Sequence, residues 1–175
     1  MMGNAYTIET ERLVLRKTLP YDFDDFSKYY GDAEVAQWLL GHNADDAAIA
    51  AAFSFNLGLD TCFSVVLKCT ERVIGNVHFV NVTENYLAEI GYVLCPEHWG
   101  RGLMTEAVLA AVDYAFNKCG FMRLRAITEA HNDASAKVLR RCGFMHEATI
   151  YEAAYGGRVA DVCYYSRITL RTSGQ

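Results

Sequence analysis

The chain has 175 residues, 52% of them apolar, which is enough for one domain with a sizeable hydrophobic core. Its formal net charge of −5 gives a nucleic-acid-binding function no electrostatic support. No apolar run reaches the length of a membrane span, and the N-terminal residues lack the basic and apolar regions of a signal peptide. We therefore expect a single domain over residues 1–175, located in the cytoplasm, with neither nucleic acid nor membrane as a partner.

The cysteines are scattered at wide intervals and include no Cys-x-x-Cys pair. This spacing is typical of reduced, mostly buried thiols rather than of a zinc site or a disulfide framework. Cys95 and Cys142 flank the two motifs described below, but the sequence shows no base next to either thiol. We therefore expect both cysteines to be structural, and we expect no bound metal.

The first half of the chain predicts strands interrupted by helices. Alternating apolar and polar residues predict strands, and apolar residues at three- and four-residue steps predict helices. Asp22 is the expected N-cap of the first helix, and the second and third strands are expected to form a hairpin. In chain order these elements are a strand at Thr7–Lys17, helices at Asp22–Tyr30, Ala33–Leu40 and Asp45–Leu57, and strands at Thr61–Lys68 and Val73–Val82.

A strand, a glycine-containing turn and a long helix come next. Alternation predicts a strand over residues 86–94, and Pro96 ends it. Helical periodicity runs from Met104 to Cys119, and Gly120 stands where a left-handed residue would end the helix. The turn between them, Trp99 to Thr105, places glycines before a helix N-terminus. Such a turn presents unpaired backbone N–H groups and can hold a phosphate or pyrophosphate.

The rest of the chain adds two strands and a helix before a final strand. Met122 to Glu129 predicts a strand, and Asn132 to Cys142 predicts a helix. Phe144–Tyr155 and Val159–Leu170 predict two strands around Gly156-Gly157, which is a hairpin signal. Helices and strands in this order predict an α+β domain with a mixed sheet.

The segment PEHWGRGLMTEA, from Pro96 to Ala107, resembles the acetyl-CoA loop of the GNAT N-acetyltransferases, in the branch that includes the ribosomal-protein N-terminal acetyltransferases. That family writes the loop Gln/Arg-x-x-Gly-x-Gly/Ala, which puts Gly102 at the invariant glycine and leaves Trp99 and Met104 as departures. Neither departure removes a backbone N–H. Other phosphate loops fit poorly, because the Walker Lys-Ser/Thr pair is missing and a dinucleotide fingerprint needs glycine where Thr105 stands.

A second motif, HNDASAKVLRRCGF from His131 to Phe144, resembles the Asn-x-x-Ser segment of the same family with its terminal Gly-Phe. By itself this motif is also explained as a helix N-terminus capped by Asn132 or Asp133. The two motifs together extend the resemblance over nearly the whole chain. The resemblance implies a mixed, mainly antiparallel sheet that is flanked by helices and splayed at the acetyl-CoA site.

The resemblance also implies the roles of individual residues. Backbone N–H groups of the central strand would hold the pantetheine and the thioester carbonyl, and those of the loop would hold the pyrophosphate. Ser135 would donate a proton to the leaving sulfur, and no covalent enzyme intermediate is needed. Glu106 is expected to complement the dipole of its helix. The implied cofactor residues are Val93, Leu94, Gly100, Arg101, Gly102, Leu103, Met104, Thr105 and Asn132. The side chains of Arg101 and Lys137 are further candidates for contacts with the CoA phosphates, and each is equally explained as a solvated residue.

For the general base, Glu89 is the best single candidate. It precedes Trp99 by ten residues, which matches the distance of the catalytic glutamate from the loop in histone-type members of the family. A glutamate on a half-buried strand equally well pairs with an arginine or faces solvent. His78, His98 and His131 have suitable intrinsic pKa values, but a lone histidine is more often structural.

We therefore predict an N-acetyltransferase that uses acetyl-CoA and acts on a primary amine. The acceptor stays open, because the α-amine of a protein or peptide, a polyamine, an aminoglycoside and an amino-acid analogue all suit the same machinery. A CoA-binding regulatory domain without turnover is the main non-enzyme alternative, against which Asn132 and Ser135 argue. A nucleotide-binding module unrelated to CoA would instead bind ATP or NAD. A homodimer also stays open.

Overall fold

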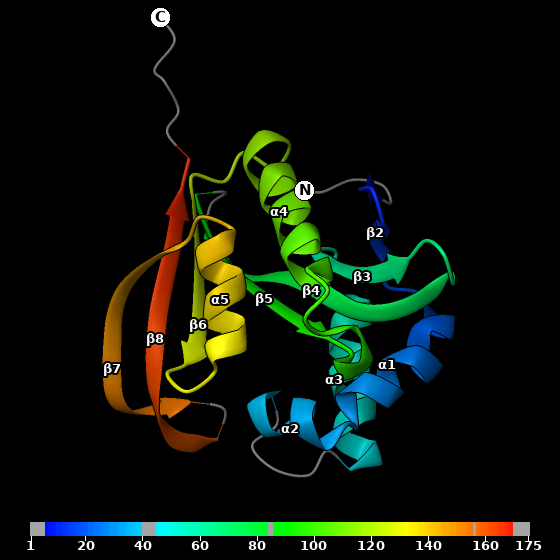
Figure 1. Ribbon diagram of the computed structural model, residues 1–175, viewed down its shortest axis with the longest axis horizontal. Coiled ribbons are helices and arrows are strands. Elements are labelled where there is room, and N and C mark those ends of the chain that lie inside the picture. The colour runs from blue at the N-terminus through cyan, green and yellow to red at the C-terminus, as the bar shows by residue number, and fades with distance from the viewer. Residues whose placement is uncertain (1–5, 40–44, 84–85, 156, 170–175) are drawn as a thin grey trace, which may run out of the picture.

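The computed structural model describes residues 6–39, 45–83, 86–155 and 157–169 (Figure 1). Its strands form one eight-stranded sheet in the order β1-β2-β3-β4-β5-β6-β8-β7. Neighbouring strands are antiparallel except for β5 and β6, which are parallel. The predicted α+β class, with a mixed and mainly antiparallel sheet flanked by helices, is confirmed.

The elements follow the predicted order along the chain. The strands are β1 (Thr7–Glu9), β2 (Leu13–Lys17), β3 (Cys62–Leu67), β4 (Arg72–Thr83), β5 (Leu87–Leu94), β6 (Arg123–Glu129), β7 (Met145–Tyr155) and β8 (Arg158–Ile168). The helices are α1 (Phe23–Tyr30), α2 (Ala33–Leu39), α3 (Asp46–Gly58), α4 (Leu103–Asn117) and α5 (Asp133–Arg141), with short 3-10 turns η1 (Pro20–Asp22) and η2 (Pro96–His98). Within the described ranges, no helix combines the length and the apolar character needed to cross a membrane.

Helices α4 and α5 lie against one face of the sheet (Figure 1). Burial of the predicted stripe at three- and four-residue steps holds α4 there, because it removes a continuous apolar surface from water. α5 adds Leu139, which is 1% exposed, to the same core. The buried stripe of α4 consists of Met104, Ala107, Val108, Ala111, Val112 and Ala115.

The opposite face of the sheet is covered by α1 and α3. Phe26 of α1 and Phe53 of α3 contact each other edge to face, with ring centroids 5.1 Å apart. Both belong to a second buried cluster that includes Val66 of β3 and Val93 of β5. Because successive side chains of a strand point to opposite faces, Val93 faces α1 and α3 whereas Ile90 and Leu94 face α4. The sheet therefore has two separate apolar layers.

Of two expectations near the N-terminus, the single strand was wrong, and Asp22 stands at the expected N-cap position but without the expected side-chain bond. The single strand predicted over Thr7–Lys17 is a pair of antiparallel strands, β1 and β2, because the N–H of Thr10 donates to the Leu13 carbonyl and turns the chain. Asp22 precedes α1 but caps it with no side-chain hydrogen bond. Its carboxylate instead accepts two hydrogen bonds from Arg16, each 2.7 Å long.

The sheet opens in its centre, between its two parallel strands. β5 pairs with β6 only over Leu87 to Glu89, opposite Arg123 to Arg125. Beyond these pairs β5 continues to Leu94 and β6 to Glu129, and the two strands diverge (Figure 1). The predicted splay is confirmed, and the loop before α4 and the start of α5 both follow strands that border this gap.

Candidate active site

The register of β4 and β5 decides which backbone groups of β5 face the gap. Cys95 donates its N–H to the Ile74 carbonyl at 2.8 Å, and Val93 lies opposite Asn76. In an antiparallel pair, residues that bond to the partner alternate with residues that point away. The N–H of Leu94 therefore points to the β6 side, whereas that of Val93 points to β4. This register corrects the expectation that both residues offer an N–H to the cofactor.

The loop before α4 contains two glycines in the left-handed conformation. Gly100 has a φ of 74° and Gly102 a φ of 75°, which other residues adopt only at a cost in energy. Among the described residues, a Cβ at Gly100 would meet no atom within 4 Å, and one at Gly102 would meet only Arg12 Nη2, at 3.7 Å. The space beside both glycines is therefore open to a ligand. Trp99, a departure from the family loop, donates its indole N–H to the Leu94 carbonyl at 2.8 Å and ties the loop to β5.

The first turn of α4 presents backbone N–H groups to this open side. The first helical bond runs from the Glu106 N–H to the Gly102 carbonyl, at 3.1 Å. The N–H groups of Leu103, Met104 and Thr105 therefore have no acceptor within the helix. Since the side chains of Leu103 and Met104 are buried, the core fixes the direction of this turn. The positive end of the helix dipole adds to its suitability for an anion.

An ion pair that the sequence did not predict anchors the loop to the β1–β2 turn. Glu106 accepts hydrogen bonds from Thr10 Oγ1 at 2.6 Å, from the Arg12 N–H at 2.9 Å and from Arg12 Nε at 2.7 Å. Arg12 also donates to the carbonyl of Arg101, at 3.0 Å. Partial burial opposes ionisation of Glu106, yet the hydrogen bonds from Thr10 and Arg12 outweigh it and lower its pKa. Glu106 therefore does more than complement the helix dipole, because it fixes the position of the loop.

Ser135 and Tyr92 meet across the gap. Asn132 caps α5 by accepting the Ser135 N–H at 3.0 Å, and this bond fixes the first turn of the helix. Ser135 Oγ lies 2.9 Å from the phenolic oxygen of Tyr92, which comes from β5. Burial raises the pKa of Tyr92 above its usual value, so the phenol stays protonated at neutral pH. Tyr92 was not predicted, because only the fold brings it to Ser135.

Glu89 lies where β5 and β6 part, on the face opposite to Tyr92 and Ser135. Its neighbours Ala88 and Ile90 pack under α4, so its own side chain points to the α1 and α3 side. The carboxylate forms an ion pair with Arg125 at 3.1 Å and accepts a hydrogen bond from Asn81 at 3.2 Å. The structure therefore brings Ser135 together with Tyr92 but places Glu89 apart from both.

The cysteines beside the motifs are poor nucleophiles. Burial raises the pKa of Cys142 to about 11, and its thiol donates to the Thr105 carbonyl at 3.6 Å. Burial also raises the pKa of Cys95 and lowers that of His98, so this neighbouring pair favours the neutral thiol and the neutral imidazole. The chemistry of these thiols therefore favours a route without a thioester on the enzyme.

The remaining candidates lie on both sides of the gap. Arg101 and Lys137 are exposed, Arg101 in the loop and Lys137 on α5. Burial lowers the pKa of His78 to about 4, so this imidazole is neutral at pH 7. His78 packs closely on Gly91, where an added Cβ would lie 2.3 Å from His78 Nε2. His78 is thus explained by packing, and His131 is exposed beside Asn132.

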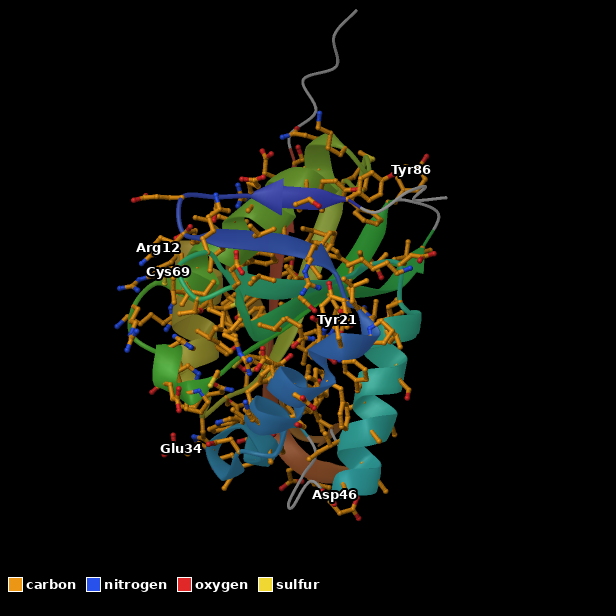
Figure 2. All side chains as sticks on the ribbon, turned by 90° about the vertical axis from the view of Figure 1, so that its right-hand side faces the viewer. Arg12, Tyr21, Glu34, Asp46, Cys69 and Tyr86 are labelled. Atoms are coloured by element: carbon orange, nitrogen blue, oxygen red, sulfur yellow. The ribbon has the colours of Figure 1, made fainter. Side chains whose placement is uncertain are left out.

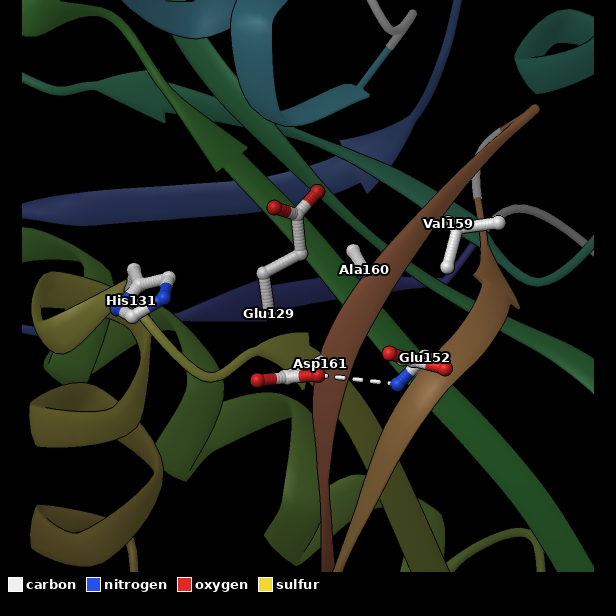
Figure 3. A pocket seen from close by; sticks show the side chains of 6 residues that line it. All are labelled: Glu129, His131, Glu152, Val159, Ala160 and Asp161. Atoms are coloured by element: carbon white, nitrogen blue, oxygen red, sulfur yellow. Dashed lines mark hydrogen bonds between the residues drawn. The ribbon is translucent and has the colours of Figure 1, made fainter.

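A pocket of about 360 Å³ opens beside the end of β6 (Figure 3). It is bordered by the carboxylates of Glu129, Glu152 and Asp161 and by His131. Asp161 accepts a hydrogen bond from the backbone N–H of Glu152 at 3.0 Å, which links β7 to β8 at this point. Glu129, at the end of β6, and His131, in the loop before α5, are the lining residues on the side of the gap. The sequence did not predict it, since its residues come from three strands and a loop.

Comparison with known proteins gives a consistent result. The acetyltransferase (GNAT) domain family matches residues 12–145. An uncharacterized N-acetyltransferase, p20, of Bacillus licheniformis is 34% identical, over 96% of this chain and 99% of its own. A ribosomal-protein-S5-alanine acetyltransferase of Vibrio fischeri superposes with a TM-score of 0.80 at 24% identity, over 97% of this chain and all of that chain. A spermidine N-acetyltransferase of Vibrio cholerae, solved with CoA and spermine, gives 0.77 at 18% identity, over 91% of this chain and 96% of that chain. Because these two solved structures are only 24% and 18% identical to this chain, their similarity supports the fold alone.

The fold and the matches define the class as that of the N-acetyltransferases. The chain belongs to the GNAT family, whose acetyltransferases use acetyl-CoA. The resemblance inferred from the two sequence motifs is confirmed at this level.

Proposed function

We propose that this protein transfers the acetyl group of acetyl-CoA directly to a primary amine, with the α-amine of a protein or peptide as the first candidate acceptor. The observation that carries the proposal is the pair formed by Ser135 and Tyr92 at the gap, 2.9 Å apart, beside a helix N-terminus that suits an anion. The continuous sheet from β1 to β7 supports a single catalytic domain over residues 1–175.

The residues present fit acetyl-CoA, which supplies an activated acetyl thioester. The N–H groups of Leu103, Met104 and Thr105 would hold the pyrophosphate, and the open space at Gly100 and Gly102 admits it. The Leu94 N–H, which points to the gap, and the amide of Asn132 would contact the pantetheine arm. Exposed Arg101 and Lys137 are proposed to meet the phosphates.

Ser135 is proposed as the general acid. Tyr92 holds its own proton because of its raised pKa, and its hydroxyl lies 3.0 Å from the Ser135 carbonyl and 2.9 Å from Ser135 Oγ. When the phenol turns its proton from the carbonyl to Ser135 Oγ, Ser135 is free to donate its own proton to the leaving sulfur. In the overall exchange the amine nitrogen gains the acetyl carbon, the carbon–sulfur bond breaks, the sulfur takes one proton and the amine releases one. The neutral amine is proposed to attack the thioester carbonyl directly. An acetylated enzyme cysteine is disfavoured as an intermediate, because burial keeps Cys95 and Cys142 in their thiol forms.

Glu89 is proposed to take the proton of the amine, directly or through water. It lies at the opening of the gap on the face opposite to Ser135, so base and acid would act from the two sides of the sheet. Its carboxylate is already paired with Arg125 at 3.1 Å and accepts a hydrogen bond from Asn81 at 3.2 Å, so an incoming amine would have to compete with both groups for it. An α-amine, with a pKa near 7.7–8.0, asks less of such a base than a lysine-like amine near 10.4. This argument favours an α-amine acceptor.

The acidic pocket supports a polyamine as the second candidate. Three carboxylates, from Glu129, Glu152 and Asp161, border it and attract a polycation electrostatically. Both acceptor classes occur in the names of proteins that share this fold, one an S5-alanine and one a spermidine acetyltransferase. The acidic pocket thus favours a polyamine, whereas the pairing of Glu89 with Arg125 favours an α-amine. One assay separates the two acceptors.

The deciding experiment offers peptides with free N-termini, polyamines and aminoglycosides with acetyl-CoA, and measures acetylated products by mass spectrometry. The highest kcat/KM on an α-amine, with Glu89→Gln lowering the rate more for amines of high pKa, supports the first candidate. A preference for a polyamine that is lost in Asp161→Asn supports the second. Binding of acetyl-CoA without turnover of any amine would favour a regulatory CoA-binding domain.

A further inference from the structure

Three metal-ligating side chains converge on the short turn η2 at the end of β5. The Cys95 Sγ, a carboxylate oxygen of Glu97 and a ring nitrogen of His98 all lie within 4.8 Å of one another. The turn itself produces this convergence, because the His98 N–H donates to the Cys95 carbonyl at 3.0 Å and brings the two side chains to one side. The sequence predicted no metal, since these residues do not have the spacing of a Cys-x-x-Cys pair.

An independent observation concerns His98 alone. Its Nδ1 atom is shielded from solvent, and no group in the described part of the chain hydrogen-bonds to it. A buried polar atom without a partner costs free energy, because it has lost its bond to water without replacement. Coordination of a metal ion through Nδ1 would supply the missing partner.

From this cluster we propose that Cys95, Glu97 and His98 bind a borderline-soft divalent cation of the Zn²⁺ type. Thiolate, imidazole and carboxylate are the three ligand types that Zn²⁺ takes in proteins, whereas Mg²⁺ and Ca²⁺ prefer oxygen alone. Zn–S and Zn–N distances of about 2.3 and 2.0 Å place tetrahedral ligand atoms about 3.5 Å apart. The three ligand atoms, within 4.8 Å of one another, would therefore have to move closer together on binding, and the exposed side chain of Glu97 is free to rotate toward the ion. The fourth position is left to water or another small ligand.

The site is separate from the acetyl-transfer residues but linked to them by the chain. Cys95 follows directly after Leu94, and His98 directly precedes Trp99, which ties the glycine loop to β5. A bound ion would cross-link the two ends of η2 and so reduce the freedom of this connection. The proposal does not rest on the proposed function, because binding is measured without CoA or an amine.

The test uses the full-length reduced protein, without a histidine tag, titrated with Co²⁺ and then with Zn²⁺ in competition. We expect one ion per chain and a thiolate-to-cobalt charge-transfer band in the near ultraviolet. Cys95→Ser and His98→Phe should each lower Zn²⁺ affinity at least tenfold, and circular dichroism verifies their folding. Cys69→Ser and His131→Asn are matched controls at exposed positions and should bind as the wild type does. The absence of the band, or unchanged affinity of Cys95→Ser, overturns the proposal.

A second measurement needs no variant. Peptide mapping after timed alkylation follows Cys95 and Cys69 in the same wild-type molecule, and Cys69 lies at the surface near Arg12 (Figure 2). We expect Zn²⁺ to slow the alkylation of Cys95 at least tenfold and to leave the rate at Cys69 unchanged. Equal protection of both cysteines, or of neither, contradicts a site at η2.

Discussion

Substitution of Gly102 by glutamate tests the proposed pyrophosphate site most directly. Gly102 is the N-cap of α4, and its left-handed φ of 75° imposes strain on any other residue, about 1–2 kcal/mol. This strain is present in the free and the bound protein, so it lowers stability and largely cancels in the binding equilibrium. In the part of the chain that the structure describes, the one atom within 4 Å of an added Cβ is Arg12 Nη2, at 3.7 Å, so the new side chain has room to extend over the anion site.

The expected loss of affinity follows from Coulomb repulsion. A carboxylate about 5 Å from one phosphate charge is disfavoured by about 1 kcal/mol in bulk water and by about 3 kcal/mol at the dielectric typical of a protein surface. We therefore expect acetyl-CoA to bind at least tenfold more weakly, which corresponds to about 1.4 kcal/mol. The neutral Gly102→Gln variant has the same bulk and should lose much less affinity, and that difference should shrink at high salt.

Titration calorimetry with acetyl-CoA and with ATP measures these effects. Gly157→Glu is the matched control, because Gly157 also has a left-handed φ, of 81°, and a Cβ there would meet no atom within 4 Å. The control should lose stability to a similar extent and keep its affinity for acetyl-CoA. If Gly102→Glu binds acetyl-CoA as tightly as the wild type, the loop does not form the cofactor site. Equal affinity of the wild type for ATP and acetyl-CoA would favour an unrelated nucleotide-binding module.

Three further outcomes are expected. Ser135→Ala should lower kcat about 10²- to 10⁴-fold with little change in acetyl-CoA affinity, and an unchanged kcat would limit Ser135 to a structural role. Tyr92→Phe, which removes the hydroxyl that contacts both the carbonyl and the Oγ of Ser135, should lower kcat about tenfold or less. Asp22→Asn should destabilise the protein by about 3 kcal/mol at pH 7 in urea unfolding, because it breaks a buried pair with Arg16. Burial of Asp22 opposes its ionisation, but Arg16 and neighbouring donors outweigh it and lower its pKa. This stabilisation should therefore be complete above about pH 4, the range of an unfolded aspartate, and decrease as the pH falls through the pKa of the folded state; a difference that is independent of pH below about pH 4 would contradict the ion pair. Glu106→Gln should weaken acetyl-CoA binding severalfold by loosening the loop, with kcat at saturation little changed, and an unaltered affinity would show that the anchor is dispensable.

Local signals in the sequence were enough for most elements. The apolar stripe of α4 was predicted because helical periodicity follows from burial of one face, and that face is the one in the core. Gly120 was placed correctly as a left-handed residue after this helix, with a φ of 76°. The prediction failed between Thr7 and Lys17, where one strand was assigned across a turn. Ile8 and Leu13 do not belong to the same alternation, since four polar residues separate them, and the hydrogen bond from Thr10 to Leu13 turns the chain within this break.

The cofactor loop and the family were also predictable, since the residues of each motif are adjacent in the chain. The roles of Gly100 and Gly102 depend on a left-handed backbone conformation, which glycine adopts far more readily than other residues do. By contrast, the sequence could not assign the direction of the Leu94 and Val93 N–H groups, because the β4–β5 register decides it. A shift of one residue would exchange the two.

The sequence by itself determined the fold class, the family and the two motifs, because these depend on periodicity and on short runs of residues. Only the tertiary structure decided which distant side chains meet: Tyr92 with Ser135, 43 positions apart, and Arg12 with Glu106, 94 positions apart. It also decided that Glu89 pairs with Arg125 and that three carboxylates border one pocket. The physical reason is that such contacts depend on strand order and on where β5 and β6 separate. No local pattern encodes those distances.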